Sequence, residues 1–338
     1  MMKTLSLLLI SLIAFANLSL KAQDTNTFAN PILTNGADPY AYYHSDGNFY
    51  FMATRGDRLN LWQTKDITQI ANVKPKTIWM APPAGPNSCS IWAPEIHYLN
   101  GKWFIYYSAA DKKNDTDAAR HIWVLENSSA NPMEGEWIDR GQINTHYTGI
   151  DGSIFEANGK IYFLYSAYVD NHSDVMIAEM QNPWTLKQPE VDLAAPKYSW
   201  EQINDRSILE GPIFLGGPGE KVFIVFSASA CWDDHYALGL LTASGKADLL
   251  NPTSWSRSEV PVFEMSVKNS VYGPGHNGFF KSPDGNEDWI IYHGKNQSSG
   301  DCAKRSTRTQ KITWKKDGTP DFGIPVSTQM KLQKPSGE

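Results

Sequence analysis

The sequence contains little cysteine and no excess of positive charge. Cys89, Cys231 and Cys302 are the three cysteines among 338 residues, and their spacing matches no metal-binding pattern. An odd number of cysteines allows at most one disulfide within the chain. The formal net charge is −6, the isoelectric point is near 5.8, and no basic run follows the pattern of a phosphate-binding segment. We therefore expect no cysteine-based metal site and no nucleic acid partner.

Long apolar runs are missing except at the N-terminus. There, Lys3 precedes an apolar run from Leu5 to Leu20, and a small residue, Ala22, marks the break before a polar segment. This pattern predicts a signal peptide over residues 1–22, with a retained membrane anchor as the alternative. No other stretch approaches the roughly 20 apolar residues that a spanning helix requires. We expect a mature protein that is secreted or periplasmic and has no membrane contact after cleavage.

Sustained helical periodicity is also missing, so long helices find no support. Hydrophobic residues make up 41% of the chain and charged residues 20%, which fits a globular protein with a real core. Aromatic residues reach 12%, which is high. Their rings either fill the cores between sheets or offer flat faces to sugar C–H groups.

An internal repeat organises the rest of the chain. Five segments share one plan: a short strand with an acidic residue or histidine beside glycine or proline, then a turn, then a strand rich in aromatic residues. The marker residues lie about 60 residues apart, a period typical of repeat architectures. These markers are Asp38, Glu95, Asp151, Glu210 and His276.

The turns within the repeat indicate β-hairpins. Asn100-Gly101 and Asn158-Gly159 separate aromatic runs, and such pairs favour type I′ turns. Each period has room for four antiparallel strands, which predicts an all-β, five-bladed β-propeller as a single domain over residues 28–334. A β-sandwich is the alternative, but it does not explain five similar units. If Cys231 and Cys302 lie in neighbouring blades, they are the favoured disulfide pair, and unpaired thiols remain the alternative.

Because the first strand of every blade lines the channel of a propeller, Asp38, Asp151, Glu210 and His276 should converge on one small volume. Carboxylates gathered in a partly dry pocket repel one another, which raises at least one pKa and separates an acid from a base. Hydrolysis of a glycosidic bond requires this arrangement. For a single carboxylate, a role as a turn or cap residue is the alternative.

Four short motifs resemble those of glycoside hydrolase family 43, whose members are five-bladed propellers acting on plant cell-wall arabinans and xylans. The motifs occur in the family's order, and the resemblance covers nearly the whole mature chain: Ala37-Asp38-Pro39-Tyr40, Trp92-Ala93-Pro94-Glu95, Ile150-Asp151-Gly152-Ser153 and Leu209-Glu210-Gly211-Pro212. The resemblance implies an inverting enzyme with Asp38 as general base, Glu210 as general acid, and Asp151 as the residue that orients Glu210 and raises its pKa.

The resemblance also suggests substrate-binding residues. His276 lies in a segment similar to the family's axial histidine segment, where the imidazole holds a water network or a structural Ca²⁺ ion through waters. We expect no required cofactor. Of two arginines in a late segment similar to one that binds the terminal sugar, we favour Arg308 over Arg305. Trp92 is a candidate stacking platform and Trp232 a candidate contact at the rim, with packing roles as the alternative for both.

The late segments resemble the α-L-arabinofuranosidase branch most, which implies release of terminal arabinose from arabinan or arabinoxylan. We also expect a monomer. β-Xylosidase and endo-arabinanase branches share the same three carboxylates and remain alternatives. A carbohydrate-binding propeller without turnover is the alternative from another class, although it would be expected to lack at least one carboxylate.

Overall fold

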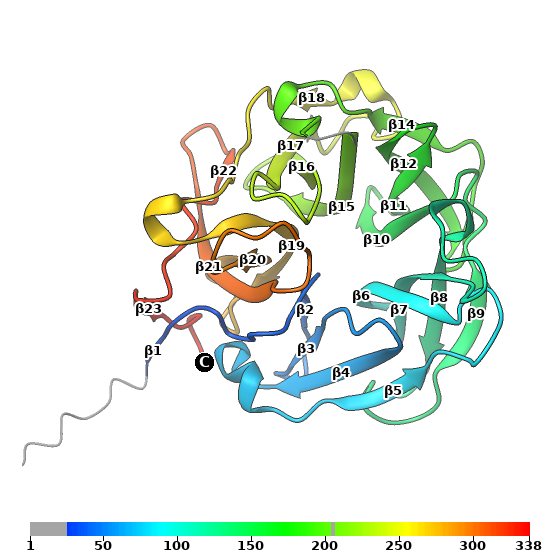
Figure 1. Ribbon diagram of the computed structural model, residues 1–338, viewed down its shortest axis with the longest axis horizontal. Coiled ribbons are helices and arrows are strands. Elements are labelled where there is room, and N and C mark those ends of the chain that lie inside the picture. The colour runs from blue at the N-terminus through cyan, green and yellow to red at the C-terminus, as the bar shows by residue number, and fades with distance from the viewer. Residues whose placement is uncertain (1–25, 204–206) are drawn as a thin grey trace, which may run out of the picture.

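The computed structural model describes residues 26–203 and 207–338, which form strands arranged around a central region (Figure 1). The predicted signal peptide, residues 1–22, lies outside the described residues. Within the described part, helix occurs only as short 3₁₀ turns, and none is long and apolar enough to cross a membrane. These turns are η1 (Ile67–Asn72), η2 (Asp117–Ala119), η3 (Ser199–Glu201), η4 (Pro252–Ser254) and η5 (Val267–Asn269). The all-β prediction is confirmed.

Most strands fall into five consecutive antiparallel groups of four main strands. The first two groups are β2 (Tyr40–Tyr43), β3 (Phe49–Met52), β4 (Arg58–Thr64) and β5 (Lys76–Met80), then β6 (Cys89–Leu99), β7 (Lys102–Ala110), β8 (His121–Asn127) and β9 (Ile138–Gln142). The third is β10 (Gly149–Ala157), β11 (Lys160–Val169), β12 (His172–Asn182) and β14 (Val191–Ala194), with β13 (Thr185–Leu186) also paired to β12. The last two are β15 (Ser207–Gly216), β16 (Lys221–Ala228), β17 (Ala237–Ser244) and β18 (Ser256–Arg257), then β19 (Tyr272–Lys281), β20 (Asp288–Lys295), β21 (Ser306–Trp314) and β22 (Pro320–Asp321).

Two pairings lie outside this scheme. β12 and β15 form a short parallel contact at His172↔Ser207 and Ser173↔Ile208, which joins the third and fourth groups into one sheet. β1 (Thr27–Phe28) pairs with β23 (Leu332–Gln333), so the two ends of the described chain meet beside the first and fifth groups (Figure 1). The sequence repeat does not predict either pairing.

The predicted hairpin turns are present. Asn100 and Gly101 have φ values of 52° and 79°, and Asn158 and Gly159 have values of 53° and 71°. Positive φ at both central residues is the requirement of a type I′ turn, whose twist matches that of the flanking strands. These turns fix the register of β6 with β7 and of β10 with β11, and they thereby fix which side chains face each neighbour.

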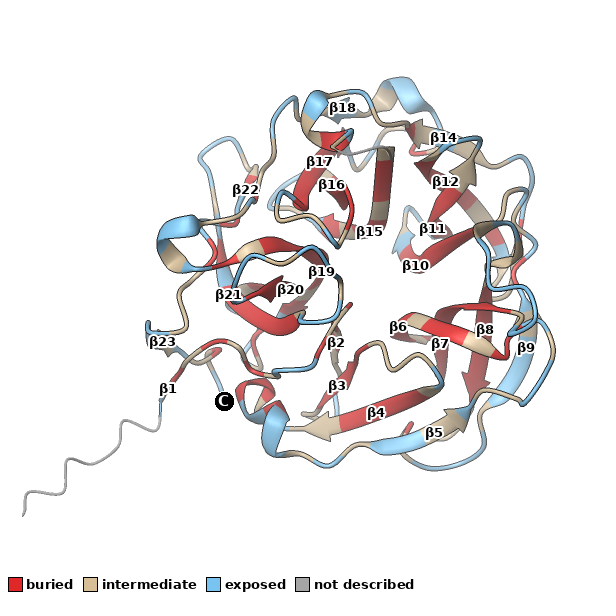
Figure 2. Ribbon diagram, viewed as in Figure 1, coloured by how far each residue is buried: buried red, intermediate tan, exposed pale blue. Residues whose placement is uncertain are grey.

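Alternate side chains of a strand point to opposite faces of its sheet. In the second strand of each group, one face packs against the preceding group and the other against the following group, so both faces are buried. In β3, Tyr50 packs against Trp103 of the second group with ring centroids 4.8 Å apart, whereas Phe49 packs against Phe280 of the fifth group at 5.3 Å. All of β3 is accordingly buried (Figure 2). Hydrophobic clusters of this kind lie between each pair of neighbouring groups, including the fifth and the first.

The first strands of the groups lie innermost and contact one another in sequence. β2 contacts β6, β6 contacts β10, β10 contacts β15, β15 contacts β19, and β19 contacts β2. Each marker residue of the repeat lies in a first strand or, for Asp38, just before one, so this arrangement brings the strands that carry the markers toward the central region (Figure 1).

Candidate active site

A cavity of about 590 Å³ opens where the starts of the first strands approach one another. Four predicted site residues line it together: Asp38, Asp151, Glu210 and His276. The fifth repeat marker, Glu95, does not line the cavity. It is buried and pairs with His97, whose Nε2 lies 3.0 Å from its Oε2.

A left-handed backbone turn aims these side chains into the cavity. Asp38, Asp151 and His276 have φ values of 52°, 60° and 48°, a conformation that costs free energy in residues with a Cβ atom. The register of Asp151 and His276 with the next strand is broken at the same point by an irregularity of the β-bulge type. The bulge turns the side chain out of the sheet and toward the centre.

Hydrogen bonds from the preceding group hold these strained turns. Ser108 Oγ accepts from the backbone N–H of Asp151 at 3.0 Å, and Ser227 Oγ accepts from that of His276 at 2.7 Å. Ser108 and Ser227 occupy the same place near the end of the second strand in their groups. One group therefore positions the functional residue of the next.

The carboxylate of Asp38 is surrounded by donors and cations. Thr54 Oγ1 donates to Oδ2 at 2.6 Å, and Arg305 Nη1 donates to Oδ1. Oδ1 also lies 3.5 Å from His276 Nδ1 and 3.3 Å from His293 Nδ1. Burial raises the pKa of Asp38, but Arg305 and the two imidazoles outweigh it and hold the pKa well below the usual value. Asp38 is therefore ionised at neutral pH.

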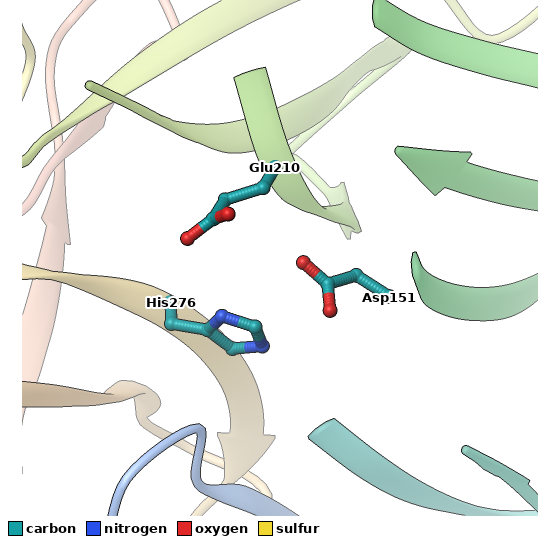
Figure 3. Close-up of side chains that lie close together, drawn as sticks. All are labelled: Asp151, Glu210 and His276. Atoms are coloured by element: carbon teal, nitrogen blue, oxygen red, sulfur yellow. The ribbon is translucent and has the colours of Figure 1, made fainter. Parts of the chain in front are cut away.

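The pKa values of Glu210 and Asp151 are shifted in the opposite direction to that of Asp38. Burial raises the pKa of both carboxyl groups, and the charge of each nearby carboxylate raises it further. Tyr236 donates its hydroxyl to Glu210 Oε1 at 2.6 Å, while the N–H of Gly211 donates to Asp151 Oδ2 at 3.0 Å. The two carboxyl groups and the His276 imidazole point toward one another (Figure 3). A proton is thus retained beside an ionised Asp38, which gives one cavity both an acid and a base.

The pKa values of the two histidines of the site are shifted in opposite directions. Burial lowers the pKa of His276, but Asp38, Asp151 and Glu210 outweigh it, so the pKa is raised. Burial and Arg305 lower the pKa of His293 to about 3. His293 is therefore neutral and accepts the backbone N–H of Asp38 at Nδ1, at 3.3 Å.

Asp151, Glu210 and His276 each offer one potential metal ligand, and these atoms lie within 4.8 Å of one another. Ca²⁺ takes six to eight oxygen ligands, so this group alone does not complete its shell. One oxygen of each carboxylate already accepts a protein hydrogen bond. A calcium ion here would need waters for most of its ligands, and no chemical step below uses one.

The two predicted tryptophans both line the cavity. Trp232 is 38% exposed, which suits a residue at the mouth. One face of Trp92 is covered by the guanidinium of Arg120, 4.3 Å from the ring centroid, and Arg120 is held by Asp115 at 2.8 Å. The face of Trp92 that Arg120 covers is therefore not available to a sugar.

The structure does not bring Arg308 to the cavity. Its guanidinium is buried and donates to the carbonyl of Val326 at 3.0 Å and to Asn296 Oδ1. Arg305 lines the cavity instead and contacts Asp38. The preference for Arg308 is corrected for a topological reason: Arg308 lies within β21, the third strand of its group, while Arg305 precedes that strand and remains near the centre.

The sequence did not predict several residues that line the cavity or contact the acid. These are Thr54, Arg120 and Tyr168 in the cavity wall, and Tyr236, which donates to Glu210. Thr54 carried a signal: it lies two residues after the second strand of its group, close to the place that Ser108 and Ser227 occupy at the ends of theirs. The loops that supply Arg120 and Tyr236 differ between the groups, so the repeat contained no signal for them.

The favoured disulfide is confirmed. Cys231 and Cys302 are bonded, and both line the cavity, whereas Cys89 is a free thiol.

An all-β fold that holds an ionised carboxylate and a protonated one in a single cavity is the arrangement of a glycoside hydrolase. The profile of the family described as glycosyl hydrolases family 43 matches residues 28–320. The chain belongs to this family, as its motifs suggested.

Several relatives are similar over most of the chain. An extracellular exo-α-(1→5)-L-arabinofuranosidase of Streptomyces avermitilis is 40% identical over 92% of this chain, and the chain spans 66% of that relative's length. A protein of the same name from Streptomyces chartreusis is 37% identical over 79% of this chain and 82% of its own. The crystal structure of an α-L-arabinofuranosidase from Lactobacillus brevis is 39% identical, with a TM-score of 0.84 over 89% of this chain and 98% of that one.

Proposed function

We propose that this chain is an inverting, exo-acting α-L-arabinofuranosidase that releases terminal α-L-arabinofuranosyl residues from arabinan or arabinoxylan. The observation that carries the proposal is that the pKa of Asp38 is lowered and that of Glu210 is raised in one cavity, because hydrolysis with inversion needs a base and an acid at once. The sugar follows from the names of the relatives that are 37–40% identical.

In the proposed reaction, Asp38 takes a proton from a water, and the resulting hydroxide attacks the anomeric carbon. The bond to the leaving oxygen breaks, and Glu210 donates its proton to that oxygen. Asp151 holds the strand of Glu210 through the N–H of Gly211, and the repulsion between the two carboxylates disfavours ionisation of both at once, so that a proton is kept between them. The new hydroxyl group is bonded to the anomeric carbon on the face opposite the departing group, so the configuration inverts.

Substrate recognition is assigned to the cavity wall. Arg305 replaces Arg308 as the arginine proposed to donate to sugar hydroxyls, because its guanidinium lies in the cavity. Trp92, Trp232 and His276 keep their proposed contacts with the sugar. The proposed Ca²⁺ near His276 stays a prediction, and elemental analysis of the purified protein without bound calcium would remove it.

We also propose that residues 28–334 form one five-bladed β-propeller. The hydrophobic cluster between the fifth and first groups supports this fold, as does the contact of β19 with β2. The proposed monomer is tested by light scattering in solution. Export to the periplasm or medium, with cleavage after Ala22, is supported by the extracellular names of two relatives and is tested by sequencing the mature N-terminus.

The test of function is a product profile. The protein is incubated with linear arabinan, arabinoxylan and xylo-oligosaccharides, and arabinose as the sole first product is the expected result. Arabino-oligosaccharides as first products would indicate an endo-arabinanase, and xylose would indicate a β-xylosidase. Binding without turnover would favour the non-catalytic propeller and would contradict the proposal.

Replacement of the carboxylates tests the residue roles. Asp38→Ala, Asp151→Asn and Glu210→Gln should each lower kcat on arabino-oligosaccharides by on the order of 10²- to 10⁴-fold, the usual contribution of acid–base groups. An aryl arabinofuranoside, whose leaving group needs no protonation, should recover activity in Glu210→Gln but not in Asp38→Ala. Near-normal turnover in any of the three would remove that residue's assignment.

A further inference from the structure

Two loops from neighbouring groups form one wall of the cavity. The first runs over 229–236 between β16 and β17 and carries Trp232, and the second runs over 296–305 between β20 and β21 and ends at Arg305. The disulfide between Cys231 and Cys302 joins these loops across 71 residues of sequence. Neither cysteine has a part in the acid–base chemistry described above.

The loops are joined at two levels. At the base of the second loop, the Lys295 ammonium is buried and lies 2.8 Å from Asp234 Oδ1, and it also donates to the carbonyl of Ser299 at 2.6 Å. The disulfide lies further along the loop, beside the cavity. The ion pair fixes where the second loop begins, whereas the disulfide fixes the part that approaches Asp38.

The Cys302 end of the disulfide holds Arg305. The carbonyl of Cys302 accepts a hydrogen bond from Arg305 Nε at 2.8 Å, and the other side of the same guanidinium donates to Asp38 Oδ1. The carbonyl of Arg305 accepts from the N–H of Gly36 at 3.2 Å, so the backbone has its own anchor. The hydrogen bond to the Cys302 carbonyl therefore sets the direction of the Arg305 guanidinium.

The Cys231 end is anchored beside the proposed acid. The N–H of Ser229 donates to the carbonyl of Ile208 at 3.1 Å, two residues before Glu210. At the other end of the same loop, Tyr236 donates to Glu210. The disulfide therefore connects the loop that holds the acid to the loop that holds the cation of the base.

We propose that the Cys231–Cys302 disulfide is a positioning element of the active site, which holds Arg305 in place against Asp38. This inference rests on the proposed function, because it concerns the base of that reaction. Arg305 and His276 attract the charge of the Asp38 carboxylate, His293 is a neutral neighbour, and Asp151 and Glu210 face it as acids. Loosening Arg305 removes the strongest of these attractive charges and raises the pKa of Asp38.

The experiment compares kcat, KM and the pH dependence of kcat/KM on an aryl α-L-arabinofuranoside for the wild-type protein and matched variants. Cys231→Ser/Cys302→Ser removes the disulfide, and Cys89→Ser removes the free thiol as the control. Arg305→Ala gives the effect of losing the cation altogether. The triple variant, with both serines and Arg305→Ala, shows whether the disulfide acts through Arg305.

In the double serine variant, the acidic limb of the pH profile of kcat/KM should move to higher pH. The shift should be smaller than the shift in Arg305→Ala. KM should increase by roughly 10-fold, since small displacements of positioning groups have effects of this order or more. In the triple variant the limb should equal that of Arg305→Ala, because the disulfide then has no guanidinium to position. Cys89→Ser should match the wild type.

Two results would overturn the proposal: an unchanged acidic limb and KM in a folded double serine variant, or full additivity of its effect with Arg305→Ala. A lower melting temperature does not discriminate, because any disulfide stabilises the chain. If the double serine variant does not fold, reduction of the folded Cys89→Ser protein by a phosphine provides the same comparison. Failure of the proposed function is separate: the wild type itself would then show no turnover, or Glu210→Gln would match the wild type on arabino-oligosaccharides, whose leaving group needs protonation.

Discussion

At the scale of single residues, this site separates an acid from a base by giving similar carboxyl groups unlike surroundings. Asp38 and Asp151 are buried and Glu210 is partly buried, and removal of each carboxyl group from water by itself raises its pKa. Arg305 donates to Asp38, and together with His276 it reverses the effect of burial on the pKa of that carboxyl group. The repeat predicted which carboxylates converge, whereas the roles of base and acid came only from the family resemblance, because the cation beside Asp38 comes from a loop outside the repeat.

Tyr236→Phe tests the acid. The hydroxyl of Tyr236 donates to Glu210 and lowers its pKa, so removing it should raise that pKa further. An acid works while it is protonated, so the basic limb of kcat/KM should move to higher pH. The phenylalanine ring keeps the stacking on His293, whose centroid lies 5.4 Å away. Tyr106→Phe, which loses a hydroxyl bonded to Pro183, is the matched control and should leave the limb in place. A basic limb that moves to lower pH in Tyr236→Phe would contradict this account.

Arg305→Lys tests the base by keeping a charge but losing the planar fork. Asp38 works while it is ionised, so a raised pKa removes activity from the acid side first. In Arg305→Lys, the acidic limb of the pH profile of kcat/KM should move to higher pH by less than in Arg305→Ala, and KM should increase in both variants. Equal limbs in the wild type and Arg305→Ala would show that Arg305 does not hold Asp38 ionised.

At the scale of secondary-structure elements, each first strand depends on the second strand of the preceding group. Turn residues and aromatic alternation were enough to predict the hairpins, because both are local signals. The left-handed turns at Asp38, Asp151 and His276 were not predicted, because their cost is met by hydrogen bonds from another group. Arg308 was misassigned for a related reason, since spacing alone does not show which strand of a group reaches the centre.

Ser108→Ala tests this dependence between elements. The buried N–H of Asp151 would lose its acceptor, which should lower the free energy of unfolding by about 1–3 kcal/mol. The turnover should also fall, because Asp151 is less well held. Ser244→Ala, at an exposed position at the end of β17, is the control and should change stability by less than about 0.5 kcal/mol. Urea denaturation measures both, and equal stabilities would show that the hydrogen bond does not hold the turn.

At the scale of the whole molecule, the hydrophobic clusters between neighbouring groups join the chain into one structure. The cluster of the fifth and first groups matters most for the proposed propeller, because it links segments at opposite ends of the sequence. The repeat predicted five similar units, and the structure shows five groups of strands. The parallel contact of β12 with β15 could not be predicted, because it has no counterpart between the other groups.

Phe51→Ala tests that link. Phe51 is fully buried in the cluster between the fifth and first groups, so truncation should lower the free energy of unfolding by about 3–5 kcal/mol. If the ends of the ring hold each other, unfolding should remain a single transition at a lower denaturant concentration. Two separate transitions, with the first group unfolding alone, would contradict the closed arrangement.

The most direct test of the central claim, that Asp38 and Glu210 act as base and acid in an inverting exo-hydrolase, is the anomeric form of the first product. Time-resolved proton NMR of the wild-type protein with a linear α-1,5-linked arabino-oligosaccharide resolves the two anomers before they equilibrate. We predict that β-L-arabinofuranose appears first, released one residue at a time. First appearance of the α-anomer, or release of longer fragments without the monosaccharide, would contradict the account.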